Sequence, residues 1–115
     1  MLGFDLAHIG VNAKDATMSL GIARQLATMF NQPLKEGNSS NFAGKGFEIN
    51  KSKGLGTHGH IAMATNSIAR AIAWLERKGI AIDLNSAKKD PAGALVAVYL
   101  KDEIGGYAVH LLQKK

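Results

Sequence analysis

Three histidines and one glutamate are the residues of this chain best suited to bind a metal ion or to move a proton. His8 opens the short stretch His-Ile-Gly-Val-Asn, and His60 opens His-Ile-Ala-Met-Ala-Thr-Asn. Glu48 and His110 each lie between two bulky apolar residues, in Phe-Glu-Ile and Val-His-Leu. Imidazoles and carboxylates bind Zn, Ni, Mn and Fe, and they also serve as general acids and bases. These four side chains are therefore the candidates for chemistry.

The four candidates occupy corresponding points of two similar halves of the chain. In each half a strand that opens on histidine is followed by a helical pattern, and the last strand carries Glu48 or His110. This internal duplication predicts one domain over residues 1–115, built from module 1 (1–52) and module 2 (57–115). A loop rich in Gly and Lys, Ser52–Gly56, joins the modules.

The elements that must position these residues follow from hydrophobic periodicity and turn signals. Apolar residues at helical spacing predict helices over 15–30 and 67–78, with Asn66 as an N-cap and Gly79 just past the second helix. The bulky residues Met29, Phe30, Met63 and Trp74 are expected in a helix–sheet core. Strands are predicted near 4–12, 33–36, 39–43, 46–51, 58–65, 80–84, 94–101 and 106–113, which gives an α+β fold of two βαβββ modules.

Strand alternation determines which candidates share a face of the sheet. Successive residues of a strand point to opposite sides, so bulky apolar neighbours under the helices would leave all four candidates on the helix-free face. A single strand histidine is more often a hydrogen-bonded structural residue, and Glu48 alone could be a surface charge. The repetition of the pattern favours a real site. His58 lies nearer the loop and is interpreted as a rim residue.

Composition excludes several functional classes. The formal net charge is +5, but the basic residues are scattered and aromatic residues are few, which argues against nucleic-acid binding and favours a small anionic ligand. No apolar run approaches the ~20 residues of a membrane span, and no signal peptide is evident, so no membrane association and a cytoplasmic location are expected. The absence of cysteine excludes disulfides and thiolate ligands.

Further polar residues are weaker candidates. Hydroxyl and ammonium groups near the site could hold a carboxylate or phosphate, although each is by default an ordinary loop or edge-strand residue. Tyr99 is a candidate proton donor whose commoner role would be core packing. The candidate ligand-binding residues are Ser39, Ser40, Lys45 and Lys53.

Several motifs together resemble the vicinal oxygen chelate superfamily of glyoxalases, bleomycin-resistance proteins and extradiol dioxygenases. They are His-Ile-Gly-Val-Asn at 8–12, Gly-Phe-Glu-Ile at 46–49, the stretch that begins at His60, and Tyr-Leu-Lys-Asp-Glu-Ile-Gly-Gly-Tyr-Ala-Val-His at 99–110. Residues 36–48 and 53–60 most resemble the short domains that some bacteria carry beside 2-keto-3-deoxy-6-phosphogluconate aldolase. The resemblance implies a curved mixed sheet, a glyoxalase-like cup, with the helices on its convex face.

The resemblance also implies a divalent metal ion bound by His8, Glu48, His60 and the residue at position 110. Glyoxalase-type members carry glutamate at that last position, where it doubles as the base, whereas this chain has His110. A neutral imidazole binds Zn, Ni, Mn or Fe well, but it must leave the metal to act as a base. The candidate catalytic residues are thus Glu48, His110 and Tyr99.

Three functions remain open at this stage. One is a metal-dependent lyase or isomerase acting on a small anionic oxo- or hydroxy-acid, of the kind related to sugar acids. The second is a non-catalytic binding module of the bleomycin-resistance type, and the third is an accessory domain of an aldolase. In this superfamily paired modules often form two-fold dimers, so the resemblance also implies a homodimer.

Overall fold

The computed structural model describes the whole chain, residues 1–115, as eight strands and two helices. The first half contains β1 (Asp5–Asn12), α1 (Ala16–Met29), β2 (Leu34–Glu36), β3 (Ser40–Ala43) and β4 (Phe47–Asn50). The second half contains β5 (Gly59–Thr65), α2 (Ile68–Arg77), β6 (Ile82–Lys89), β7 (Leu95–Leu100) and β8 (Tyr107–Gln113). The predicted α+β fold with a βαβββ order in each half is confirmed.

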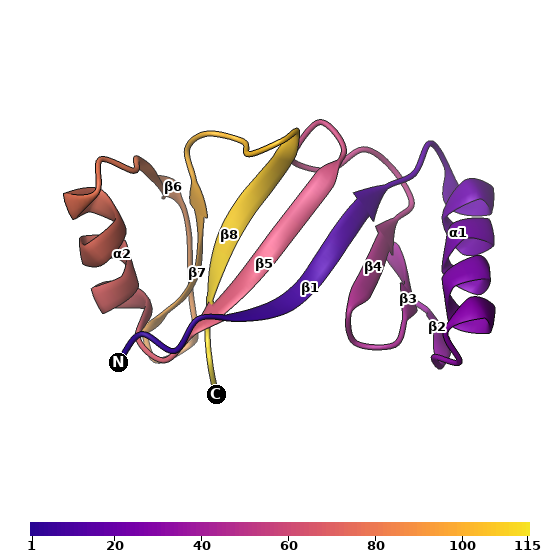
Figure 1. Ribbon diagram of the computed structural model, residues 1–115, viewed down its shortest axis with the longest axis horizontal. Coiled ribbons are helices and arrows are strands. Elements are labelled where there is room, and N and C mark those ends of the chain that lie inside the picture. Colours follow the sequence, from indigo (N-terminus) through magenta and orange to yellow (C-terminus); the bar gives the residue numbers. More distant parts are fainter.

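All eight strands form one curved, mixed sheet in the order β2-β3-β4-β1-β5-β8-β7-β6 (Figure 1). β1 and β5 run antiparallel at the centre, and each pairs on its other side with the last strand of its own half in a parallel ladder. The strand order of the second half therefore mirrors that of the first about the β1–β5 pair. This approximate two-fold symmetry brings β1, which carries His8, and β5, which carries His60, side by side.

Each helix covers the sheet of its own half. α1 lies against β2, β3 and β4, and α2 lies against β7 and β8, at opposite ends of the molecule (Figure 1). Asp15 caps α1 by accepting a hydrogen bond from the backbone N–H of Met18 at 2.8 Å. The prediction that Asn66 caps α2 is wrong, because the side chain of Ser67 accepts the hydrogen bond from Arg70 N–H. No helix is both long enough and apolar enough to cross a membrane.

The apolar interior is divided into two small clusters. One contains Ala13, Ala23 and Ile49 under α1, and the other contains Ile68, Ala71, Val98 and Leu111 under α2. The accessible surface of 7305 Å² exceeds the roughly 6,100 Å² expected for a compact monomer of this mass. The chain alone therefore leaves more surface exposed than a compact monomer does, and this surface includes large apolar side chains such as Met18, Leu84 and Ile104.

Two sequence predictions about packing and strand length are wrong in detail. Met29 and Phe30 are 64% and 55% exposed and Trp74 is 37% exposed, so only Met63 of the predicted core group packs against a buried cluster. β6 extends to Lys89, beyond the predicted 80–84, although its pairing with β7 is irregular after Asp83. Ser86 accounts for part of this irregularity, since its hydroxyl bonds Asp83 C=O and accepts from Tyr99 N–H.

Candidate metal site

Strand register aligns the candidate residues in two neighbouring rows across the helix-free face of the sheet. Glu48, Gly10 and His60 are direct partners across β4, β1 and β5. In the next row the direct partners are, in order, His8 on β1, Ala62 on β5, His110 on β8 and Tyr99 on β7. Paired residues point to the same side of a sheet, so these side chains project together. Ile49 and Leu111, which follow Glu48 and His110 in sequence, belong to the apolar clusters under the helices.

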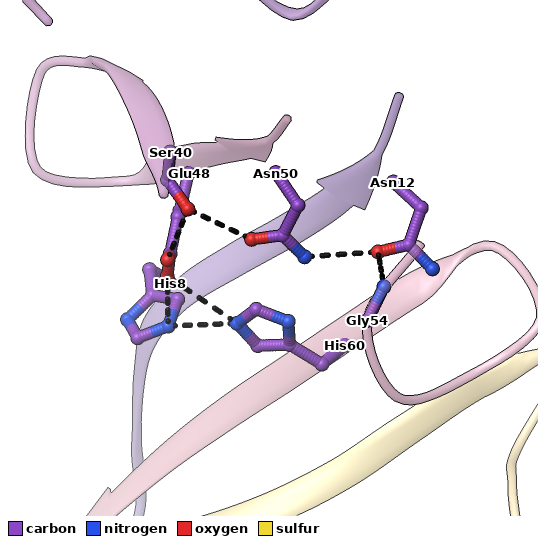
Figure 2. A network of polar contacts seen from close by, with 7 residues as sticks. All are labelled: His8, Asn12, Ser40, Glu48, Asn50, Gly54 and His60. Atoms are coloured by element: carbon purple, nitrogen blue, oxygen red, sulfur yellow. Dashed lines mark hydrogen bonds and ion pairs between the residues drawn. The ribbon is translucent and has the colours of Figure 1, made fainter. Parts of the chain in front are cut away.

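Three of the four predicted ligands form a close triangle of polar atoms (Figure 2). His8 Nε2 and His60 Nε2 are 3.1 Å apart, and Glu48 Oε1 lies 3.4 Å from the first and 3.5 Å from the second. The side chains are partly accessible, with 22%, 9% and 25% of their surface exposed for His8, His60 and Glu48 respectively. A small ligand could therefore reach them from the solvent.

His110 lies beside this triangle. One ring nitrogen from each of His8, His60 and His110 falls within 4.8 Å of the others. The ring centroid of His110 is 5.2 Å from that of His60 and 5.8 Å from that of His8. Its Nε2 atom is buried and has no hydrogen-bond partner. A buried imidazole nitrogen without a partner is costly, and binding to a metal ion would remove that cost.

Gly10 makes room for the ring of His60 at the centre of the sheet. A Cβ atom on Gly10 would lie 1.9 Å from Cε1 of the His60 ring. Only glycine allows the His60 ring to lie across β1 at this point. Sequence reasoning did not assign this role to Gly10, and the only available signal was a glycine inside a predicted strand.

The electrostatics of the cluster favour a neutral His8, a neutral His110 and an ionised Glu48. Burial, together with repulsion from His60 and His8, lowers the pKa of His110 to about 4. Burial also lowers the pKa of His8, although the nearby Glu48 charge opposes this shift. The hydrogen bond with His60, helped by one with Ser40, lowers the pKa of Glu48 to about 2. At neutral pH these three groups are thus in the protonation states that metal ligation requires.

These residues fit a divalent ion in composition and spacing. Two ligands each about 2.1 Å from a tetrahedral ion are separated by roughly 3.4 Å, which is close to the observed glutamate–histidine separations. Neutral imidazoles have one N–H each, so they cannot satisfy every contact of the triangle by hydrogen bonding alone. Three imidazoles and one carboxylate would suit Zn, Ni, Mn or Fe.

The other candidate residues have different surroundings. Ser40 was predicted to bind a ligand, but it is buried. Its hydroxyl lies 2.9 Å from two acceptors, Glu48 Oε2 and Asn50 Oδ1, and is therefore not free for a ligand. Ser39, Lys45 and Lys53 are exposed, and no side-chain hydrogen bond ties them to the site. His58 is also exposed and lies against Tyr107.

Tyr99 lies beside the candidate ligands. Its ring stacks on that of His110 with centroids 4.6 Å apart and planes inclined by 13°. Burial, with a contribution from the Glu48 charge, raises the pKa of Tyr99. The Tyr99 hydroxyl therefore stays protonated at neutral pH and can donate a proton or a hydrogen bond.

Comparison with solved structures places this arrangement in a known fold. A hypothetical protein, BH1468 from Bacillus halodurans C-125, superposes with a TM-score of 0.65 at 17% identity, covering 98% of this chain and 96% of that one. A methylmalonyl-CoA epimerase in complex with methylmalonyl-CoA and NH4+ superposes with a TM-score of 0.62 at 15% identity, covering 99% of this chain and 96% of that one. The chain has the glyoxalase-like fold. Methylmalonyl-CoA epimerase from Mycobacterium tuberculosis superposes with a TM-score of 0.58 at 16% identity, covering 96% of this chain and 87% of that one.

The glyoxalase-like fold is established by structure alone. No protein-family model matches the sequence, and no curated protein is significantly similar to it. The structural relatives named here are epimerases and a hypothetical protein, so the resemblance to aldolase-associated domains gains no support from them. Because one fold hosts many activities, function must be argued from the site.

Proposed function

We propose that this protein is a metal-dependent isomerase or lyase of the vicinal oxygen chelate superfamily, acting on a small anionic oxo- or hydroxy-acid. His8, Glu48, His60 and His110 would hold the divalent ion. The observation that carries the proposal is the convergence of three histidines and one glutamate on the helix-free face. The bound ion would supply Lewis-acid polarisation of adjacent substrate oxygens.

Two kinds of group in the site are suited to moving a proton. Glu48 is ionised and can accept a proton from a carbon next to a carbonyl. His110, whose lowered pKa keeps the imidazole neutral, is the second candidate base, but it would have to leave the metal to act as one. Tyr99, whose pKa is raised, stays protonated and can donate a proton beside His110. An acid and a base in one site are what an epimerisation or an elimination requires.

An anionic substrate agrees with the charge of the chain and with the structural relatives. The formal net charge is +5, and Lys88 is near enough to His110 to affect its pKa. Methylmalonyl-CoA, present in one related structure, carries a carboxylate next to a thioester carbonyl. Such a pair of oxygens is the kind of group that an ion in this site would chelate. Ser39, Lys45 and Lys53 are retained as candidates for holding the far end of a longer ligand.

A homodimer is part of the proposal. The sheet centre carries no helix over β1 and β5, and the chain exposes more surface than a compact monomer. All four candidate ligands come from one chain, so each subunit of a dimer would carry a complete site.

A binding module without catalysis is the second candidate function. None of the surface hollows of the chain is lined by the four candidate ligands, although Tyr99 lines one of them. A module that only captures a ligand needs no base free of the metal, and here all four candidate residues are proposed as ligands. An accessory role beside an aldolase rests on the sequence resemblance alone.

Elemental analysis of protein purified without an affinity tag tests the proposal directly. We expect close to one equivalent of Zn, Ni, Mn or Fe per chain, lost in the His60→Ala variant. Calorimetry of the metal-loaded protein with methylmalonyl-CoA, pyruvate, 2-keto-3-deoxygluconate and its 6-phosphate then tests the substrate class. Absence of metal, or equal binding of neutral analogues, would contradict the proposal. Binding of an acid without turnover would favour the binding module.

A further inference from the structure

A chain of hydrogen bonds runs from the loop between the two halves to the back of Glu48 (Figure 2). Asn12 accepts from Gly54 N–H at 3.2 Å and donates to Gly56 C=O at 3.0 Å. Asn50 Nδ2 then donates to Asn12 Oδ1 at 2.9 Å. Ser40 Oγ lies 2.9 Å from both Asn50 Oδ1 and Glu48 Oε2. We call Asn12, Asn50 and Ser40 the amide–hydroxyl network.

Backbone groups fix the orientation of this network. A backbone N–H can only donate and a C=O can only accept, so Gly54 and Gly56 together determine which end of the Asn12 amide faces which way. Asn12 in turn orients Asn50, and Asn50 presents its oxygen to Ser40. Position 56 needs glycine for this close approach, because a Cβ there would lie 1.9 Å from Gly59 O. The Ser40 hydroxyl is thus held beside Glu48 Oε2.

The network contacts one carboxylate oxygen and leaves the other to the histidines. Glu48 Oε2 accepts from the Ser40 hydroxyl, whose single proton is shared with Asn50 Oδ1 at the same distance of 2.9 Å. Glu48 Oε1 lies 3.4 Å from His8 and 3.5 Å from His60. Ser40 is only 3% exposed, so water does not replace its hydroxyl easily. A flexible glutamate side chain held at Oε2 loses much of the freedom to turn Oε1 away from the site.

The second half of the chain offers an internal comparison. The register that pairs Gly10 with Glu48 pairs Ala62 with His110, so Glu48 and His110 are equivalent. The same registers make Ala64, Leu112 and Ala97 the counterparts of Asn12, Asn50 and Ser40. The equivalent of the network is therefore entirely apolar beside His110. That imidazole is held by the Tyr99 stack and needs no hydrogen-bond support of this kind.

We propose that Asn12, Asn50 and Ser40 are positioning residues that hold Glu48 as a metal ligand and tie its geometry to the loop between the two halves. The proposal rests on the metal site proposed above. The amide–hydroxyl network occurs only in the half whose last strand carries a carboxylate as the candidate ligand. This correspondence distinguishes the network from polar residues that merely lie on the sheet surface. Hydrogen bonds from outside the coordination sphere commonly change metal affinity 10–100-fold.

The test exchanges the network for its counterparts in the second half. Ser40→Ala, Asn50→Leu and Asn12→Ala are loaded with Co(II), and the dissociation constant and visible spectrum are measured for each. We expect a weakening of Co(II) binding of about tenfold to 100-fold. The visible bands should also change, because a water molecule in place of the glutamate alters the ligand field of Co(II). Ser52→Ala, an exposed serine two residues after Asn50, is the matched control and should behave as wild type.

A double-mutant cycle separates positioning from general stability. In a Glu48→Gln background, Ser40→Ala should cause no further loss of Co(II) affinity, because the group it positions no longer binds. Ser40→Thr, which keeps the hydroxyl, should restore the wild-type spectrum, and Asn50→Leu provides an independent variant if the extra methyl group of Ser40→Thr disturbs folding. Wild-type affinity and spectrum in folded Ser40→Ala and Asn50→Leu would overturn the positioning role alone. Failure of wild-type protein to bind Co(II) would overturn the metal site and this role together.

Discussion

Tyr99 and His110 stack almost in parallel on neighbouring strands, with ring centroids 4.6 Å apart and planes inclined by 13°. The two residues are direct partners in the β7–β8 ladder, so the backbone register itself brings the rings together. In the other half the equivalent pair is Phe42 and Glu48. In each half an aromatic residue is thus paired with the candidate ligand of the last strand. Only His110 has a ring that can stack on its aromatic partner.

The stack predicts separate effects of the ring and the hydroxyl of Tyr99. Tyr99→Phe keeps the ring, so metal affinity should be unchanged, while any proton-donating activity should fall. Tyr99→Leu removes the stack, which is worth about 0.5–1.5 kcal/mol in aromatic pairs, so metal affinity should fall about two- to tenfold. Metal titration and steady-state rates measure the two effects. Equal metal affinities in the Phe and Leu variants would show that the stack does not hold His110.

Metal binding should stabilise the fold. An ion that binds only the folded state adds about 2.7 kcal/mol at 100 times its dissociation constant. For a chain of this size the melting temperature should rise on the order of 10 °C. His60→Ala should abolish the rise measured by differential scanning fluorimetry, whereas His58→Ala, at the exposed neighbouring histidine, should retain it. A rise that survives His60→Ala would place the ion elsewhere.

Gly10→Ala should damage the site more than the fold. The added Cβ would meet the His60 ring, so the ring must turn away from His8 and Glu48. Overpacking of this kind costs about 1–3 kcal/mol, and metal affinity should fall with the displaced ligand. Gly46→Ala is the control, because a Cβ there meets nothing within 4 Å. Thermal unfolding and metal titration of both variants make the comparison, and tight metal binding by Gly10→Ala would contradict the geometry described here.

The sequence predicted the architecture well because its strongest signals were periodic. Histidine-opening strands at His8 and His60 revealed the duplication, and alternation along each strand correctly separated residues such as Ile49 from their polar neighbours. The errors lie where short-range patterns compete. Asn66 and Ser67 are both good N-caps, and only the structure shows which one accepts from the first turn. Met29 and Phe30 continue the helical stripe beyond the point where the sheet can cover them.

The supporting residues of the site could not be predicted in the same way. Asn12 and Asn50 look like ordinary strand-end residues in sequence, and their connection depends on the parallel register of β1 and β4. Ser40 was assigned to ligand binding from its place in a polar loop, but the β3–β4 ladder directs it to Glu48 instead. Contacts between strands that are distant in sequence decide these roles, and single-sequence patterns contain little information about them.

The dimer predicted from the resemblance can be tested through the exposed apolar surface. Sedimentation velocity over a wide concentration range should show a species of twice the chain mass. The dimer should persist in high salt, because burial of apolar surface does not weaken with ionic strength as exposed ion pairs do. A monomer at every concentration would leave the excess surface of this chain unexplained by self-association. Mixing His8→Ala with His60→Ala chains should restore no metal binding, since each site is built within one chain.

Acid should destabilise the metal-free protein in two separate ranges of pH. The folded-state pKa of His110 is about 4, below the 6.5 of an ordinary histidine, so as pH falls from 6.5 to 4 the unfolded chain gains a proton that the folded chain does not. The free energy of unfolding then decreases, with a limiting slope of about 1.4 kcal/mol per pH unit for one proton. Burial of His8 acts in the same direction. Glu48, with its pKa lowered from 4.5 to about 2, contributes stability that is present above pH 4.5 and is lost between 4.5 and 2.

Two substitutions assign these ranges to their residues. His110→Gln should flatten the dependence of the unfolding free energy on pH between 6.5 and 4, while Glu48→Gln should flatten it between 4.5 and 2. His58→Gln, at an exposed histidine, should leave both ranges unchanged. Urea denaturation of metal-free protein at closely spaced pH values measures the slopes. Stability that rises as pH falls from 6.5 to 4, or an unaltered slope in His110→Gln, would show that His110 is not held neutral by its surroundings.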